Sequence, residues 1–132
     1  MAERPVFERA ITPQPADIDE LGHVNNAVYV RWIQDIATAH WRAVARAADV
    51  DRYVWVVTRH EIDYRRASKL GEALTARTWV GEPQGARFDR FVEIVGADGR
   101  VRVSARTVWA LVDLATMRPI RIQPEVAAPF LG

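Results

Sequence analysis

Cysteine is absent from the 132-residue chain, which excludes disulfides, a thiolate nucleophile, and cysteine-ligated zinc or iron–sulfur sites. The only histidines are His23, His40 and His60, and no two of them have the His-x-His or His-x-x-x-His spacing of metal ligands. We therefore predict that the protein has no metal and no other cofactor. A chain without cysteine folds equally well in a reducing compartment, which favours a cytoplasmic location.

The chain also lacks an excess of charge of either sign. Its 18 Lys and Arg residues nearly balance 17 Asp and Glu residues, so no global field favours nucleic acid or an anionic membrane as a partner. No window approaches 18 uninterrupted apolar residues, and the N-terminal residues contain no apolar run typical of a signal peptide. Any anionic ligand must therefore be recognised by local cations.

What is present is the composition of an ordinary globular protein. Hydrophobic residues make up 49% of the chain and charged residues 27%, far from the composition of disordered or fibrous proteins. No repeat, linker or change of composition divides the sequence. We expect a single domain over residues 1–132 with one core.

A single long helix is predicted from Asn26 to about Ala47. Gly22 permits a tight turn before it, and Asn25 or Asn26 can cap its first turn. At 1.5 Å per residue this helix would be roughly 30 Å long. Its few charges and many alanines indicate that other elements wrap around it. The positions that recur every three to four residues along its inner face are Tyr29, Ile33, Ile36, Ala37, His40, Trp41, Val44 and Ala48.

Strands are predicted for the rest of the chain, and Asp98-Gly99 is a hairpin signal between two of them. The order of one strand, one long helix and about five more strands in an antiparallel meander predicts an α+β fold, in which a curved sheet of five to six strands wraps a central helix. Unpaired edge strands of such a sheet favour a homodimer or a dimer of dimers. The predicted strands are Val6–Ile11, Tyr53–Tyr64, Ala73–Val80, Arg87–Val95, Val101–Val112 and Pro119–Ile122.

The loop before the helix carries the residues most suited to chemistry. Asp17, Asp19 and His23 precede the helix start directly, where free amides and the helix dipole create a positive potential. A carbonyl held against these amides would have its developing oxyanion stabilised, while a nearby carboxylate attacks it or activates water. The pattern thus indicates a hydrolase site.

The same residues also fit a purely structural interpretation. Two aspartates before a helix are often a solvated loop or a favourable contact with the helix dipole. His23 at a helix start is disfavoured as a cation and is more often a neutral hydrogen-bonding partner. The bare pattern does not decide between the two interpretations.

A resemblance to a known family favours the catalytic interpretation. The stretch Asp17–Trp32 resembles the signature of hot-dog-fold thioesterases of the 4-hydroxybenzoyl-CoA thioesterase-like family, and His23-Val-Asn-Asn26 is similar to the acyl-ACP thioesterase version. The segment Asp63–Glu72 resembles a second, less specific motif of the same proteins. The matching positions in the first stretch are Asp19, Gly22, Val24, Tyr29, Arg31 and Trp32.

This resemblance implies a thioesterase in which Asp19 is the nucleophile or general base and the backbone amide of Asn26 polarises the thioester carbonyl. It implies that His23 orients water or substrate, and that Asp63 has a catalytic part. Asp17 is then the lesser carboxylate. Some bacterial members carry a tyrosine four residues before the aspartate and a histidine seven after it, whereas this chain has Pro15 and Asn26 there.

The substrate implied is an acyl-CoA or an acyl-carrier-protein thioester. Around the catalytic positions, Asp17, Gly22, Val24, Asn25 and Tyr29 are expected to shape the substrate site. The acyl tunnel is expected between the helix and a partner's sheet, lined by residues such as Tyr29, Ile33 and Trp55.

The phosphates of CoA need local cations, and a cationic cluster lies in the second motif. Arg65, Arg66 and Lys69, beside Ser68, could clamp these phosphates. The alternative is that they form an ordinary solvated strand end, because arginine and lysine are common at such positions.

Two other functions fit the expected fold. Hot-dog enoyl-CoA hydratases and dehydratases use an Asp and a His five residues apart in an Asp-x-Asn-Pro-x-His motif, whereas Asp19 and His23 are four apart and no Asn-Pro follows. A non-catalytic acyl-CoA-binding regulator would usually carry a further DNA-binding or partner domain. Fold alone does not decide among these functions.

Overall fold

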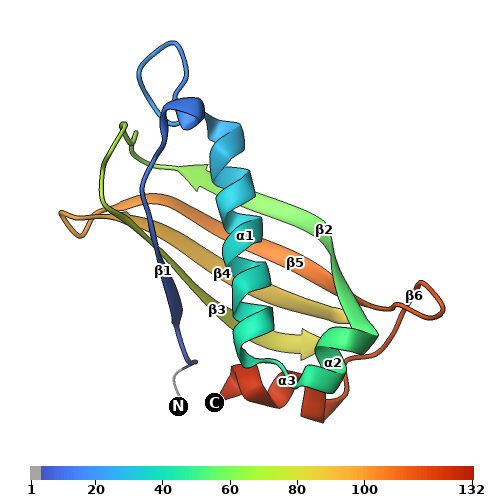
Figure 1. Ribbon diagram of the computed structural model, residues 1–132. Coiled ribbons are helices and arrows are strands. Elements are labelled where there is room, and N and C mark those ends of the chain that lie inside the picture. The colour runs from blue at the N-terminus through green and yellow to red at the C-terminus, as the bar shows by residue number, and fades with distance from the viewer. Residues whose placement is uncertain (1–3) are drawn as a thin grey trace.

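The computed structural model describes residues 4–132, in which a curled antiparallel sheet is wrapped around one long helix (Figure 1). Helix α1 crosses the inner face of the sheet, and β1 runs beside it. None of the helices in residues 4–132 is long and apolar enough to span a membrane. In chain order the elements are β1 (Phe7–Ile11), the 3-10 helix η1 (Pro15–Asp17), α1 (Asn26–Val44), α2 (Ala47–Arg52), β2 (Tyr53–Tyr64), β3 (Leu74–Gln84), β4 (Arg87–Gly96), β5 (Val101–Asp113), β6 (Arg118–Pro119) and α3 (Pro124–Leu131).

This architecture confirms the predicted fold class of a long helix and a curved sheet, but the predicted meander is wrong in its order. The strands lie in the order β1-β3-β4-β5-β2, and β6 pairs with β5. β3, β4 and β5 follow one another in the sheet as they do in the chain, whereas β2 pairs with β5 at the far edge. Alternation along a strand shows which face is buried and leaves its partner unspecified. The partner of β2 is set by the need to cover both sides of α1.

The element boundaries also differ from the prediction near the C-terminal end of α1. The helix stops at Val44, and a separate short helix, α2, leads into β2. The predicted strand over Pro119–Ile122 is mostly absent, because β6 contains two residues. Helix α3 follows, with a proline in its first turn, a position at which the missing amide hydrogen of proline costs nothing. Figure 1 shows α2 and α3 closing the end of the barrel-like wrap where α1 ends.

The apolar core consists of two separate clusters along α1. The first lies under the N-terminal half of the helix, with Tyr29, Trp32 and Ile33 packed on the inner faces of β3, β4 and β5. The second lies under its C-terminal end, where Trp41 packs with Phe88 and with Phe130 of α3. The sheet curls because both clusters must be covered by the same few strands.

A belt of polar residues separates the two clusters. Helix α1 and the strands β2, β3, β4 and β5 carry residues of both clusters. On each of these elements, a polar side chain lies between the residues of the first cluster and those of the second. Arg90 on β4 pairs in register with Thr107 on β5, and Thr107 pairs with His60 on β2. We call this set the polar belt; its members are His40, His60, Thr78, Arg90 and Thr107.

Arg90 is the centre of the polar belt. Its Nη1 donates to Nδ1 of His40 at 2.8 Å and to Oγ1 of Thr78 at 2.9 Å. Arginine can only donate, so Nδ1 of His40 is the acceptor and the imidazole proton is on Nε2. Burial lowers the pKa of Arg90 to about 10, which leaves the guanidinium charged at neutral pH. A cation is thus buried between two neutral partners.

The polar belt makes stability depend on pH through His40. Burial, assisted by the Arg90 cation, lowers the pKa of His40 from 6.5 to about 4. Between those two values the unfolded chain binds a proton on this residue that the folded chain does not. Stability therefore falls as the pH drops from 6.5 to 4, by about 3 kcal/mol in total for this residue. Urea denaturation at pH 7 and pH 4.5 measures the loss.

The matched control is His40→Gln, which keeps an acceptor for Arg90 but does not titrate. The variant should lose less stability on acidification than the parent protein. Burial also lowers the pKa of His60, but His60 is unchanged in the variant and contributes equally to both curves. An identical loss of stability in the two proteins would show that His40 is not the titrating group.

Candidate active site

The loop that precedes α1 folds back on itself as a small bridged turn. Ile18 and Val24 form an antiparallel bridge, and the amide of Gly22 donates to the carbonyl of Asp19 at 3.1 Å. Gly22 has a φ of 78°, a left-handed conformation that glycine adopts without strain. The turn holds Asp19 and His23 close to the helix start, as the sequence predicted.

Asp17 is a structural carboxylate. It is buried at 6% exposure, and both of its oxygens are occupied: Oδ1 accepts from Nη2 of Arg31 at 2.8 Å and Oδ2 accepts from the amide of Gln14 at 2.9 Å. Its carbonyl accepts from the amide of Asn25. These contacts tie η1 to the first turns of α1. Neither carboxylate oxygen is free to reach a substrate.

Asp19 is arranged differently. Its Oδ1 accepts from the amides of Leu21 at 2.9 Å and His23 at 3.2 Å, as in an Asx-turn. Oδ2 has no hydrogen-bond partner within residues 4–132. The side chain is therefore fixed through one oxygen, while the other remains available. A carboxylate held in this way can attack an electrophile or accept a proton from water.

The start of α1 supplies free backbone donors. Asn25 is the cap, and its side chain accepts from the amide of Ala27 at 2.9 Å. The amide of Asn26 has no acceptor in the described part of the chain, and Asn26 is exposed. Tyr64, at the end of β2, donates its hydroxyl to the carbonyl of Asn26 at 3.3 Å. The helix start, which follows the Asp19 turn directly in the chain, thus offers an amide without an acceptor in the described residues.

The connection from β2 to β3 packs against the loop that precedes α1. The amide of Val24 donates to the carbonyl of Ser68 at 2.8 Å, and Ser68 is fully buried. Arg102 holds the connection in place, because its Nη1 donates to the carbonyl of Ala67 at 2.9 Å and pairs with Glu72. Gly96 leaves room for the Arg102 guanidinium, since a Cβ at that position would collide with it.

Tyr29 lies within the core. It is 2% exposed and forms an edge contact with Trp32, and burial raises the pKa of its hydroxyl. Ile33, also expected to line the acyl tunnel, is fully buried. Within one chain these two side chains therefore support the helix and do not line an open channel.

Asp63 lies on the outer face of the sheet. Side chains alternate along a strand, and Tyr64 beside it points inward to Tyr29 and Asn26. The Asp63 side chain is 77% exposed and has only a 3.8 Å contact with Arg65. The fold thus does not bring Asp63 of the same chain to the Asp19 turn.

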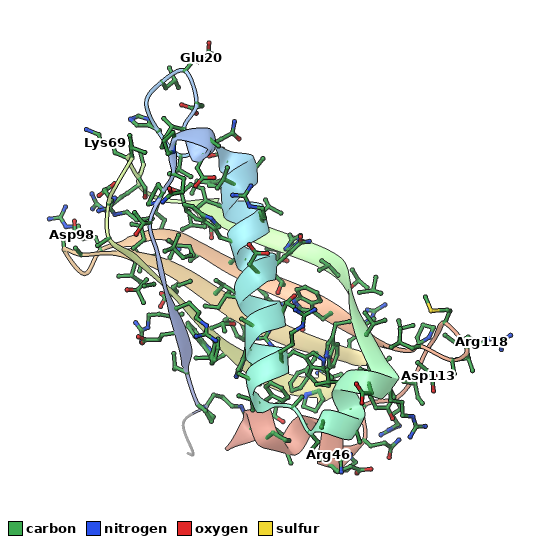
Figure 2. The ribbon with its side chains drawn as sticks, viewed as in Figure 1. Glu20, Arg46, Lys69, Asp98, Asp113 and Arg118 are labelled. Carbon is green, nitrogen blue, oxygen red and sulfur yellow. The ribbon has the colours of Figure 1, made fainter. Side chains whose placement is uncertain are left out.

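The expected cationic cluster lies at the same end of the molecule as the Asp19 turn. Figure 2 shows Lys69 and Glu20 at this end, whereas Arg46 and Asp113 lie at the opposite end. Arg65, Arg66 and Lys69 are all exposed. Nε of Arg65 donates to Ser104 at 3.0 Å. The cations are therefore displayed to solvent within the reach of a ligand bound at the loop.

Two residues that support the site were not predicted from the sequence. Tyr64 contacts the helix start, and Arg102 fastens the β2–β3 connection. Arg102 occupies a polar position in the alternation of apolar and polar residues along β5, yet it is 8% exposed. Its pairing with Glu72 brings together residues thirty positions apart, and no local pattern signals such a contact. Within residues 4–132 no group of three or more acidic or histidine side chains could hold a metal ion.

Comparison with known proteins relates this geometry to a family. A model of the thioesterase-like superfamily matches residues 13–130. The chain is 29% identical over 118 residues to an acyl-CoA thioesterase of Haemophilus influenzae, with 86% of each protein covered. It is 31% identical over 75 residues to a chloroplastic acyl-[acyl-carrier-protein] hydrolase of Cuphea viscosissima.

The match to the plant hydrolase is partial, because it covers 55% of this chain and 18% of the plant protein. Among solved structures, a predicted thioesterase from Bacillus stearothermophilus superimposes with a TM-score of 0.84 at 23% identity, covering 96% of this chain and 94% of that one. At that identity the likeness shows a common fold.

Proposed function

Because the chain belongs to the thioesterase-like superfamily, we propose that it hydrolyses an acyl thioester to a free acid and a thiol, with Asp19 as its reactive carboxylate. The observation that carries this proposal is the difference between the two aspartates. Each oxygen of Asp17 already accepts a hydrogen bond, whereas Oδ2 of Asp19 has no partner within residues 4–132. The family membership that the sequence indicated is confirmed by the match.

Two routes lead to the same products. In the first, Oδ2 of Asp19 attacks the thioester carbon, the thiolate leaves with the C–S electron pair, and water then cleaves the resulting anhydride. In the second, Oδ2 accepts a proton from water while the water oxygen attacks the same carbon; the C–S bond then breaks, and the departing thiolate takes up the proton that Asp19 holds. In both routes the carbonyl oxygen gains negative charge, which the Asn26 amide and the α1 dipole stabilise. We propose that His23 orients the water.

The donor that we propose is an acyl-CoA or an acyl carrier protein. The names of the two relatives support these two donors. Arg65, Arg66 and Lys69 would bind the phosphates of CoA or the acidic surface of a carrier protein. The cytoplasmic location expected from the sequence remains a prediction.

We also propose that the active form is a homodimer paired through β2, or a dimer of such dimers. This strand is 12 residues long and pairs on one side only, with β5. The other edge strand, β1, has five residues. A long unpaired edge favours pairing with a second copy through a two-fold axis. In that arrangement Asp63 and the acyl tunnel would have to be completed by the partner.

The first prediction concerns Asp19. Asp19→Asn keeps an oxygen for the amides of Leu21 and His23 but removes the charge, so the side chain can neither attack nor accept a proton. We expect kcat to fall by about a hundredfold to ten-thousandfold, the usual effect of deleting a nucleophile or general base. Substrate affinity should change by less than about tenfold, because the acyl and CoA contacts remain. Steady-state release of free CoA measures both quantities.

Asp17→Asn is the matched control. It weakens the contacts to Arg31 and Gln14 and should lower the melting temperature while leaving most of the activity per folded molecule. Loss of kcat in the Asp17 variant, with the Asp19 variant within about fivefold of the parent, would invert the assignment. Full activity in both variants would exclude the carboxylate mechanism.

The second prediction concerns the cations. Replacing Arg65, Arg66 and Lys69 by alanine should raise KM for acyl-CoA and leave kcat nearly unchanged, because a remote clamp binds ground and transition states alike. An acyl-pantetheine thioester, which lacks the nucleotide phosphates, is the control substrate and should show no rise. An equal rise in KM for both substrates would place the phosphate contacts elsewhere.

The third prediction concerns assembly. Light scattering at micromolar concentration should give twice the chain mass of 14.9 kDa, or four times that mass for a dimer of dimers. A mass equal to one chain under conditions in which the enzyme is active would contradict pairing through β2.

A further inference from the structure

A cavity of about 260 Å³ lies between the C-terminal half of α1 and the sheet. Thr38 and Arg42 of α1 line it, together with six aromatic side chains. A dry cavity of about 150 Å³ holds a benzene ring, so this one has room for one or two fused rings. The aromatic residues are Trp41, Tyr53, Trp55, Phe88, Trp109 and Phe130.

This cavity is distinct from the Asp19 turn of the same chain. None of the residues from Asp17 to Asn26 lines it. Thr38 and Trp41 follow Asn26 by twelve and fifteen residues on one helix, which places them about 20 Å along its axis. The cavity lies at the end of the molecule where Figure 2 labels Arg46, away from Glu20.

The cavity contains a buried cation without a counter-ion. Arg90 lines it and is 8% exposed, and only its Nη1 has hydrogen-bond partners within residues 4–132. Nε and Nη2 have none there. The adjacent carboxylate, Asp89, accepts from Nε and Nη2 of Arg106 at 3.1 Å and 2.9 Å. An unpaired buried charge is costly unless an anion compensates it.

We propose that this cavity binds a small aromatic carboxylate, with Arg90 as its counter-ion. A guanidinium has two parallel donors that match the two oxygens of a carboxylate, and Nε and Nη2 are the pair that Arg90 has free. The flat aromatic walls suit a ring, because a bound ring could make edge or stacked contacts with them. Trp41 and Trp55 already make an edge contact with each other.

The test compares 2-naphthoate with its neutral isostere 2-naphthamide by isothermal titration calorimetry on the full chain. The parent protein should bind the carboxylate at least about tenfold more tightly, since a charge-assisted pair contributes more than a neutral hydrogen bond. Because Trp41, Trp55 and Trp109 line the cavity, tryptophan fluorescence should change on binding. Equal affinity for the two compounds, or no binding of either at millimolar concentration, would overturn the proposal.

Two variants assign the preference to Arg90. Arg90→Met removes the charge with a side chain of similar length and should abolish the preference for naphthoate. Arg106→Met is the matched control, because it removes a guanidinium that already has a carboxylate partner, and it should keep the preference. Preference retained in Arg90→Met would refute the role of Arg90. If Arg90→Met does not fold, Arg90→Lys, which keeps the charge but loses the fork, should reduce the preference.

The carboxylate has two possible sources, and a second measurement distinguishes them. In an antiparallel pair of β2 strands, the Tyr53 end of one chain meets the Tyr64 end of its partner. A substrate bound at the helix start of the partner chain could then extend its acyl group into this cavity. If that acyl group carried an aromatic carboxylate, the substrate itself would supply the anion. In that case naphthoate should raise KM for a benzoyl thioester at constant kcat. If the cavity instead binds an aromatic acid that is not part of the substrate, naphthoate should leave that KM unchanged.

This second measurement rests on the proposed function, whereas the binding test does not. Asp19→Asn should bind naphthoate as tightly as the parent protein even where hydrolysis fails. A failure of hydrolysis and a failure of the cavity proposal are therefore separable.

Discussion

The burial of Arg90 is the constraint to which the rest of the core conforms. A guanidinium in the middle of an apolar interior needs polar neighbours from every element around it. His40 on α1 and Thr78 on β3 provide them, and Thr107 and His60 continue the same row across the sheet. The core is divided into two clusters at this row. A sheet must also curl to bring four polar side chains under one helix.

The division of the core gives the two ends of α1 different tasks. At its N-terminal end, contacts to Asp17 and Ser68 fix the backbone of the Asp19 turn, so the carboxylate that we propose as reactive is held by hydrogen bonds already made before substrate arrives. Such preorganisation reduces the rearrangement needed in the transition state. At its C-terminal end, aromatic side chains pack less completely and leave a cavity. Rigidity and open space are thus on opposite sides of the polar belt.

The sequence predicted what depends on local pattern. The inner face of α1, its Asn25 cap, the Gly22 turn and the exact span Tyr53–Tyr64 follow from periodicity and turn chemistry. The sequence did not predict that β2 pairs with β5, nor that Arg102 and Arg90 are buried. An arginine in an alternating strand indicates a solvent-facing position unless its distant partners are known. The family resemblance selected Asp19, whereas the occupied oxygens of Asp17 are visible only in three dimensions.

The position of β2 has a consequence for the order in which the protein is made. The ribosome releases α1 and β2 early. The strand that pairs with β2 is β5, which follows about fifty residues later. Until Val101–Asp113 has emerged, the apolar face of α1 can pack only against β1, β3 and β4, and β2 has no sheet partner. Pairings so distant in sequence form slowly, and exposed apolar surface on a nascent chain favours aggregation. Part of the apolar surface of α1 and one edge of β2 therefore stay uncovered until β5 has been synthesised.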